Sequence, residues 1–191
     1  FALFFAAVAT LVAVVRSGRR DLRFLAATQI LGILAQGVLG GITVLTHLNP
    51  ISVASHLLLS IILIAAATSL HSRRHHPQVR TSSTQVRISR LSLAHIITAF
   101  IAITIGTLVT GSGPHAGDVD APRLDFDIST ITRLHSSSVW ILLIITFIFY
   151  RSKDLRFETK KWLNIFILLA ITQGALGYIQ YWLAVPELLV G

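Results

Sequence analysis

The sequence predicts an all-α, polytopic membrane protein. Of its 191 residues, 53% are hydrophobic and only 13% are charged, and the mean hydropathy is +0.74. A soluble domain carries about 25% charged residues, so this composition is typical of the membrane class. The apolar content excludes a disordered chain, and the absence of cysteine excludes a disulfide scaffold or a zinc-thiolate site. The spacing of the apolar stretches and the placement of the basic residues support the same fold class.

Six apolar stretches are candidates for membrane spans, because a spanning helix needs about 20 mostly apolar residues. They are residues 1–15, 24–46, 52–70, 91–110, 130–150 and 162–185. The first stretch has only 15 residues but is apolar from its first position. We therefore expect a span whose outer end is missing, in an internal fragment of a longer chain that has no initiator methionine.

The basic residues indicate how the spans are oriented. Of 16 lysines and arginines, 14 fall in three of the connecting segments, and only Arg123 and Arg133 fall outside them. Translocated loops are depleted in basic residues. We therefore expect loops 16–23, 71–90 and 151–161 to be cytoplasmic and loop 111–129 to lie outside. The net charge of +8 thus reflects topology, and no nucleic-acid partner is expected.

An internal repeat runs through the chain. The pattern of residues 16–24 recurs at 151–157, and that of residues 36–42 recurs at 173–179, with an offset of 133–137 residues. An even number of spans separates equivalent positions, so the copies are parallel repeats. The expected parent contains two four-helix bundles, eight spans in all.

The repeat also predicts the domain boundaries. Residues 1–70 form the N-terminal bundle, with three of four helices and the first one truncated. Residues 71–90 form a cytoplasmic linker, and residues 91–191 form the C-terminal bundle, again with three of four helices.

Two histidines are the main candidates for a site, because ionisable groups inside a span are costly and mark functional positions. His56 and His135 each lie one to two turns below the predicted outer surface, beside small hydroxyl residues. The repeat offset gives each bundle one imidazole on each of two facing helices. That arrangement suits axial ligation of a haem iron, with the second ligand of each pair beyond the sequence. The alternative is a histidine satisfied by hydrogen bonds in the core.

Other residues leave their interpretation open. The Gln36–Ile42 pattern favours close helix packing, with a hydrogen bond from the Gln36 amide across the contact. The alternative is that these residues contact a ligand directly. Arg123 and Arg133 are candidates for contacts with haem propionates, or for a salt-bridge network with the loop aspartates. His95 reaches either the interface or a neighbouring helix. The remaining histidines are His47 at the outer mouth of its span, His71, His75 and His76 in the cytoplasmic loop, and His115 in the outer loop as a structural residue or an access-site ligand.

These residues together make the chain similar to the haem A synthase family, most closely its actinobacterial-type members. The resemblance covers essentially the whole chain, and its outer-loop string is the most specific part. The matching stretches are Gln36–Leu45, Leu48–Pro50 leading to His56, Val109–Asp118, Leu134–His135 and Pro186–Gly191.

The resemblance implies an enzyme, a haem-dependent oxidoreductase of the bacterial cell membrane. The implied reaction oxidises the C8 methyl of haem O to a formyl group by successive hydroxylations. His135 matches an axial ligand of a haem b cofactor, and His56 matches the residue that binds the iron of the substrate haem O. The family's catalytic glutamate would precede Phe1, so the fragment is expected to be incomplete for catalysis. Haem O, membrane lipid and haem O synthase are the expected partners.

Two alternatives stay open. A di-haem b-type electron-transfer protein would use the same histidine ligation without converting a substrate. A transporter built from repeats would use the histidines to handle protons or a polar substrate, but the lack of Asp, Glu or Lys deep in the spans argues against ion coupling.

Overall fold

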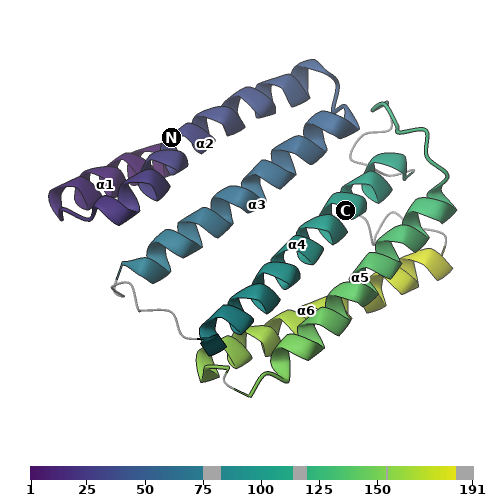
Figure 1. Ribbon diagram of the computed structural model, residues 1–191. Coiled ribbons are helices and arrows are strands. Elements are labelled where there is room, and N and C mark those ends of the chain that lie inside the picture. Colours follow the sequence, from purple (N-terminus) through teal and green to yellow (C-terminus); the bar gives the residue numbers. More distant parts are fainter. Residues whose placement is uncertain (75–82, 114–119, 154, 184–191) are drawn as a thin grey trace. The chain divides into compact units, whose positions relative to one another are not determined.

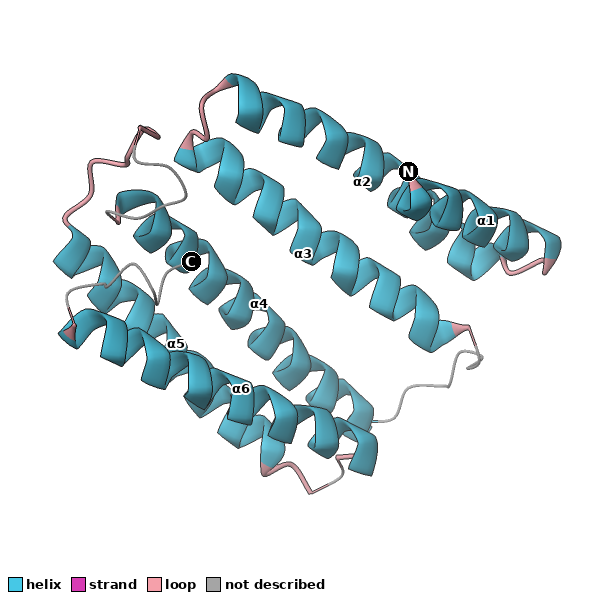
Figure 2. Ribbon diagram, turned by 180° about the vertical axis from the view of Figure 1, so that it is seen from behind, coloured by secondary structure: helices cyan, strands magenta, loops and turns pink. Residues whose placement is uncertain are grey.

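The computed structural model describes residues 1–74, 83–113, 120–153 and 155–183, without the side chains of residues 83–89. Within these ranges the chain is all-α and contains no strand, which confirms the predicted fold class. The helices, shown in Figures 1 and 2, are α1 (Ala2–Arg16), α2 (Arg20–Leu45), α3 (Pro50–Arg73), α4 (Ser83–Ser112), α5 (Ile128–Tyr150) and α6 (Phe157–Trp182).

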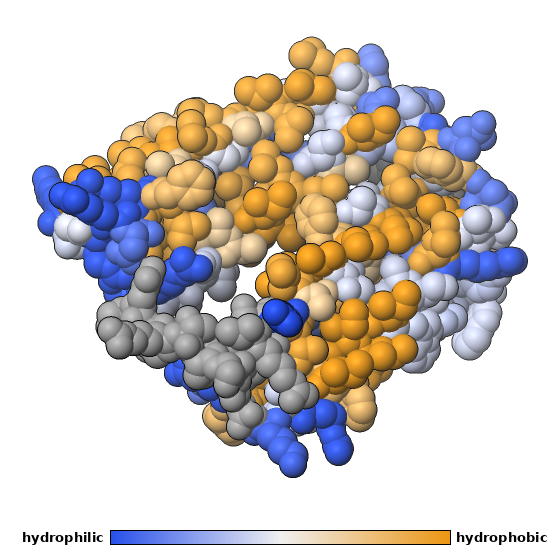
Figure 3. Space-filling view, in the orientation of Figure 1, coloured by the Kyte–Doolittle hydropathy of each residue, from blue (hydrophilic) through white to orange (hydrophobic). Residues whose placement is uncertain are grey.

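Five of these helices are long and apolar enough to cross a membrane. They are α2, α3, the Arg90–Ser112 part of α4, α5 and α6, whereas α1 has 15 residues and is shorter. Large apolar side chains along these helices are exposed in the protein alone, and Figure 3 shows hydrophilic residues gathered toward helix ends. Such a surface suits lipid as the surrounding solvent, since helices satisfy their own backbone hydrogen bonds. The protein is therefore a multi-pass membrane protein.

The chain divides into two compact units, residues 1–80 with 120–122, and residues 81–119 with 123–191. In the first unit α2 packs against both α1 and α3. Near one end, Val14, Leu22, Ala26 and Leu70 form a small buried cluster that joins the three helices. Farther along, a Cβ added to Gly32 of α2 would overlap the side chain of Leu63 of α3. A larger residue at that position would therefore force the Leu63 side chain or the helices to move.

A tight turn connects α2 to α3 and sets where α3 begins. His47 and Leu48 both have left-handed backbones, with φ of 51° and 58°, and the Leu48 N–H donates to the Thr43 carbonyl at 2.9 Å. Asn49 then caps α3 by accepting from the Ile51 N–H at 3.0 Å. Pro50 occupies the first helical position, where a missing N–H costs nothing.

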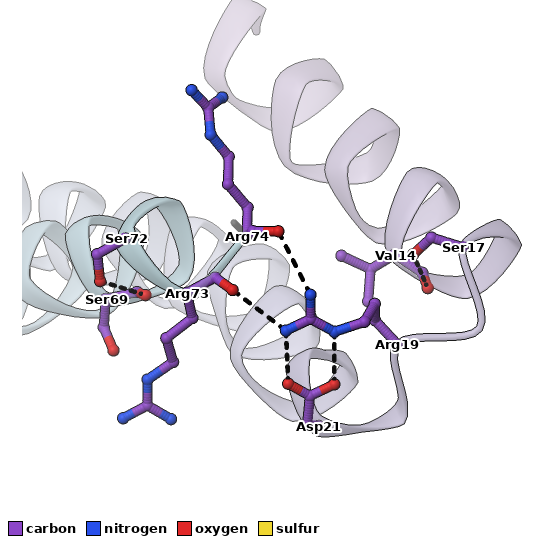
Figure 4. Close-up of polar contacts among 8 residues, drawn as sticks. All are labelled: Val14, Ser17, Arg19, Asp21, Ser69, Ser72, Arg73 and Arg74. Carbon is purple, nitrogen blue, oxygen red and sulfur yellow. Dashed lines mark hydrogen bonds and ion pairs between the residues drawn. The ribbon is translucent and has the colours of Figure 1, made fainter. Parts of the chain in front are cut away.

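Arg19 joins the start of α2 to the end of α3 (Figure 4). Its guanidinium forms a bidentate pair with Asp21, at 2.9 and 2.8 Å, and also donates to the carbonyls of Arg73 and Arg74 at 3.1 and 3.3 Å. The bond to the Asp21 carboxylate is the main cause that raises the pKa of Arg19 above its ordinary value. Terminal helix carbonyls lack partners within the helix, so this cation satisfies two of them.

In the second unit α5 packs extensively against α4 and more loosely against α6. Phe149, Leu155 and Leu163 form a buried cluster where α5 turns into α6. At the other end of α5, Asp127 caps the helix. Its carboxylate accepts from the Thr130 N–H at 2.8 Å and the Ser129 hydroxyl at 2.6 Å. These bonds lower the pKa of Asp127 to about 2.

Candidate functional site

His135 lies on the second turn of α5 and is hydrogen-bonded to α4. Its Nδ1 is 3.1 Å from the carbonyl oxygen of Ala102, a residue that is 3% exposed. A carbonyl oxygen only accepts hydrogen bonds, so Nδ1 of His135 carries the proton and donates it. In a neutral imidazole this leaves the lone pair on Nε2, the form that ligates iron.

The ring of His135 also lies directly against Gly106, one turn along α4 from Ala102. A Cβ built on Gly106 would be 3.0 Å from Cε1 and 3.4 Å from Nδ1 of the ring. The backbone carbonyl of His135 in turn accepts from the Ser138 hydroxyl at 2.6 Å. The missing side chain of Gly106 therefore leaves the space that the edge of the imidazole occupies beside α4.

His56 occupies a comparable position in the first unit, on α3 against Gly40 of α2. A Cβ built on Gly40 would be 3.6 Å from Cε1 and 3.9 Å from Nδ1 of the His56 ring. The contact is looser than the one at Gly106. In addition, Nδ1 of His56 is buried and has no hydrogen-bond partner among the described residues. Both histidines thus lie against a glycine of a neighbouring helix, but only His135 donates from Nδ1.

Gln36 holds the α3 backbone at His56. Its side-chain amide donates to the His56 carbonyl at 3.1 Å and to the Ser60 hydroxyl at 2.7 Å. The Ser60 hydroxyl itself donates to the His56 carbonyl at 3.0 Å. The predicted hydrogen bond from the Gln36 amide to the neighbouring helix is therefore confirmed. The neighbouring glycines contribute less to packing, since a Cβ added to Gly37 or Gly41 would have no neighbouring atom within 4 Å.

The glycines of the equivalent pattern on α6 do not pack against another helix among the described residues. Gln173 is exposed, and an added Cβ would meet no atom within 4 Å at Gly174 or Gly177. Of the polar side chains near it, Tyr178 pairs with Ser136 of α5 through their hydroxyls at 3.3 Å. The two copies of the Gln-Gly pattern therefore do different things within the described part of the chain.

His95 reaches a neighbouring helix, one of the two alternatives predicted for it. Its Nδ1 is 3.1 Å from the Thr146 hydroxyl of α5, and its ring packs edge-on against Phe166 of α6 at a centroid distance of 4.9 Å. It lies on the α4–α5 seam, as His135 does, but farther from the start of α5. It is part of the helix packing of the second unit.

The remaining candidates are placed by the helices that carry or flank them. Arg123 precedes α5, and Arg133 is exposed on α5 two residues before His135, a spacing at which side chains do not share a helix face. His47 is exposed in the α2–α3 turn, and His71 is exposed near the end of α3. Outside the described residues lie His75, His76, His115 and the Pro186–Gly191 stretch.

The donor set fits a haem better than a bare metal ion. Among the described residues no group of three or more His, Cys, Asp or Glu side chains could hold a metal ion. A haem iron brings four porphyrin nitrogens of its own and needs the protein only for axial ligands. A single imidazole with a defined lone pair, such as His135, meets that need.

Comparison with known proteins decides the family. The model of the COX15-CtaA family, described as cytochrome oxidase assembly protein, matches residues 1–119. The chain belongs to this family. It is the haem A synthase family, whose activity is that of an oxidoreductase. No curated protein and no solved structure matches the chain.

The COX15-CtaA match includes one histidine site and half of the other. It covers Gln36, Gly40 and His56, and it also covers Ala102 and Gly106 on α4, whereas His135 lies beyond it. The sequence analysis names both histidines as candidates but does not name the α4 residues that contact His135. The only available signal was their spacing of four, which places two small residues on one helix face.

Proposed function

We propose that the protein is a haem A synthase of the bacterial cell membrane that oxidises the C8 methyl of haem O to a formyl group. The observation that carries the proposal is the Nδ1–H bond from His135 to the Ala102 carbonyl, which leaves Nε2 as an iron ligand. Membership in the COX15-CtaA family supplies the reaction class. The fold alone would not, because four-helix arrangements bind haem for many purposes.

His135 would hold the haem b cofactor, and His56 would hold the iron of the substrate haem O. When bound, haem b supplies electron transfer, which no amino-acid side chain here provides. The chain itself binds and orients. Gly106 makes room for the His135 ring, Gly40 lies beside the His56 ring, and Gln36 holds the α3 turn that carries His56. A haem O with its long isoprenoid tail suits a site among lipid-facing helices.

Arg123 and Arg133 are proposed to contact haem propionates near the predicted outer end of α5. A guanidinium forms charge-assisted bonds to carboxylates, and both residues lie in the second unit with His135. Arg133 would reach around the helix, since it is two residues from His135. The catalytic carboxylate is not assigned to any described residue.

The test is co-expression of the full-length protein carrying this sequence with a source of haem O, followed by extraction and chromatography of the haems. We expect formyl haem with the unaltered protein. His135→Ala should lose retained haem b, whereas His56→Ala should retain haem b and lose the conversion. His71→Ala, at an exposed position near the end of α3, is the matched control and should change neither quantity.

The result also separates the alternatives. Haem b bound through His135 without any formyl haem would support a b-type electron-transfer protein and overturn the synthase. A purified protein without Soret absorbance would overturn haem binding altogether. Equal loss of haem b in His56→Ala and His135→Ala would overturn the division of roles between the two histidines.

A further inference from the structure

We infer that the two imidazoles are built to differ as iron ligands, so that His135 retains its haem while His56 releases its haem readily. The inference rests on the proposed function, because that function needs one haem that stays and one that is exchanged. It goes beyond that function by naming the residues that set the difference: Ala102 and Gly106 at His135, and Gly40 at His56.

The first difference is at Nδ1. In His135 this nitrogen donates to the Ala102 carbonyl at 3.1 Å, whereas in His56 it is buried and has no partner among the described residues. A hydrogen bond from the second ring nitrogen makes the ligating nitrogen more basic and fixes the ring orientation. Loss of such an outer partner typically lowers metal affinity by about 10- to 100-fold. His135 is therefore the stronger ligand.

The second difference is the fit of each ring against its glycine. At Gly106 an added Cβ would be 3.0 Å from Cε1 of His135, and at Gly40 it would be 3.6 Å from Cε1 of His56. The first distance leaves no room for a methyl group unless the ring moves, whereas the second is ordinary van der Waals contact. The His135 ring thus lies closer to the backbone of α4 than the His56 ring lies to that of α2.

These differences match the demands on the two sites. A resident cofactor must survive many turnovers, so tight ligation is useful. A substrate site must release its product after each reaction, and a ligand held both tightly and rigidly would slow that release. The backbone of His56 is nevertheless fixed by Gln36, so the imidazole stays in place although its ring lacks an Nδ1 partner.

Transfer of haem to excess apomyoglobin measures the two sites separately. The full-length protein, loaded with haem b in detergent, should lose haem in two phases. His56→Ala should remove the fast phase, and His135→Ala should remove the slow one. A fast phase that depends on His135, or equal rates at the two sites, would overturn the inference while leaving haem binding intact. Failure of both variants to change bound haem would instead overturn the proposed function.

A matched pair at Gly40 tests the cause. In Gly40→Ser the added Cβ would lie 3.9 Å from Nδ1 of His56. A serine rotamer that points its hydroxyl toward the ring brings the oxygen within hydrogen-bond distance of Nδ1. We expect the fast phase to slow by about tenfold. Gly40→Ala adds the same Cβ without the hydroxyl and should leave the rate within about twofold, as ordinary contact implies. Equal rates in Gly40→Ser and Gly40→Ala would contradict the role of Nδ1.

Gly106→Ala tests the other site by a spectroscopic readout. The added methyl should push the His135 ring away from α4 and lengthen the bond to Ala102. The reduction potential of the haem held by His135, followed by its absorbance, should rise because the ligating nitrogen becomes less basic, and the slow phase should accelerate. An unchanged potential with an unchanged slow phase would show that the α4 contact does not set the ligand strength.

Discussion

The hydroxyl oxygen of Thr146 lies 3.1 Å from Nδ1 of His95 and 2.7 Å from the carbonyl oxygen of Leu142. The hydroxyl has one proton, which goes to the carbonyl, so His95 donates from Nδ1 to Thr146. Among the described side chains, hydrogen bonds thus join α4 to α5 from His95 to Thr146 and from His135 to Ala102. At 1.5 Å per residue, Thr146 is about 16 Å along α5 from His135.

Replacing Thr146 should loosen the seam at one end only. Thr146 is fully buried, so Thr146→Val keeps the shape but leaves the His95 donor without its acceptor. We expect the free energy of unfolding to fall by about 1 kcal/mol, as for other polar bonds between membrane helices. Thermal unfolding in detergent measures it. Thr172→Val, which removes only a bond to the exposed α6 backbone, is the control, and equal losses would contradict the role of His95.

Enlarging Gly32 should push α2 and α3 apart. An added Cβ overlaps the Leu63 side chain, so Gly32→Ala is expected to destabilise the first unit by about 1–3 kcal/mol. Leu63→Ala should cost less in the Gly32→Ala background than in the unaltered protein, because the overlapping atoms are then absent. Gly37→Ala has open space and should be close to neutral. The same cost of Leu63→Ala in both backgrounds would show that the strain lies elsewhere.

Gln36 should matter for haem at His56 and not at His135. Gln36→Leu removes the amide bonds to the His56 carbonyl and the Ser60 hydroxyl while keeping an apolar side chain between the helices. We expect about tenfold weaker haem binding at His56, as for other residues that orient a ligand. Difference titration of His135→Ala protein measures this site alone. Gln173→Leu, at the exposed repeat position, should change nothing, and equal effects would mean that Gln36 only packs.

The cap of α5 should make its first turn sensitive to acid. The folded pKa of Asp127, about 2, is below its ordinary value of 3.8, mainly because of the bonds from Ser129 and Thr130. A lowered folded pKa stabilises the folded state above pH 4, and this contribution is lost as the pH falls toward 2. Hydrogen exchange at the start of α5 should therefore accelerate in that window.

Asp127→Asn keeps a capping side chain but cannot titrate, so it should remove that pH dependence. Asp125→Asn, at an exposed position before the helix, is the control and should retain it. Persistence of the acid response in Asp127→Asn would assign it to another group.

The spans could be predicted from the sequence because lipid demands long apolar segments, whatever their neighbours are. Helix ends were less accurate: α2 begins at Arg20 instead of residue 24, since helical hydrogen bonding continues into polar residues that hydropathy excludes. Depth in the membrane and the internal repeat were enough to make the two histidines candidates. The residues that contact His135 could not be predicted. Ala102 acts through its backbone carbonyl oxygen and Gly106 through its lack of a side chain, and neither property marks a position as functional in a single sequence.

The α2–α3 turn has a mechanical consequence for His56. His47 and Leu48 reverse the direction of the chain within a few residues, and Asn49 caps α3 immediately afterwards. The connection therefore fixes where α3 begins relative to the end of α2. A one-residue insertion inside the helix, between Pro50 and His56, would rotate His56 by about 100° about the α3 axis relative to this turn and carry the imidazole off the Gly40 face. The number of residues between the Asn49 cap and His56 therefore decides which face of α3 carries the imidazole, although none of those residues contacts Gly40.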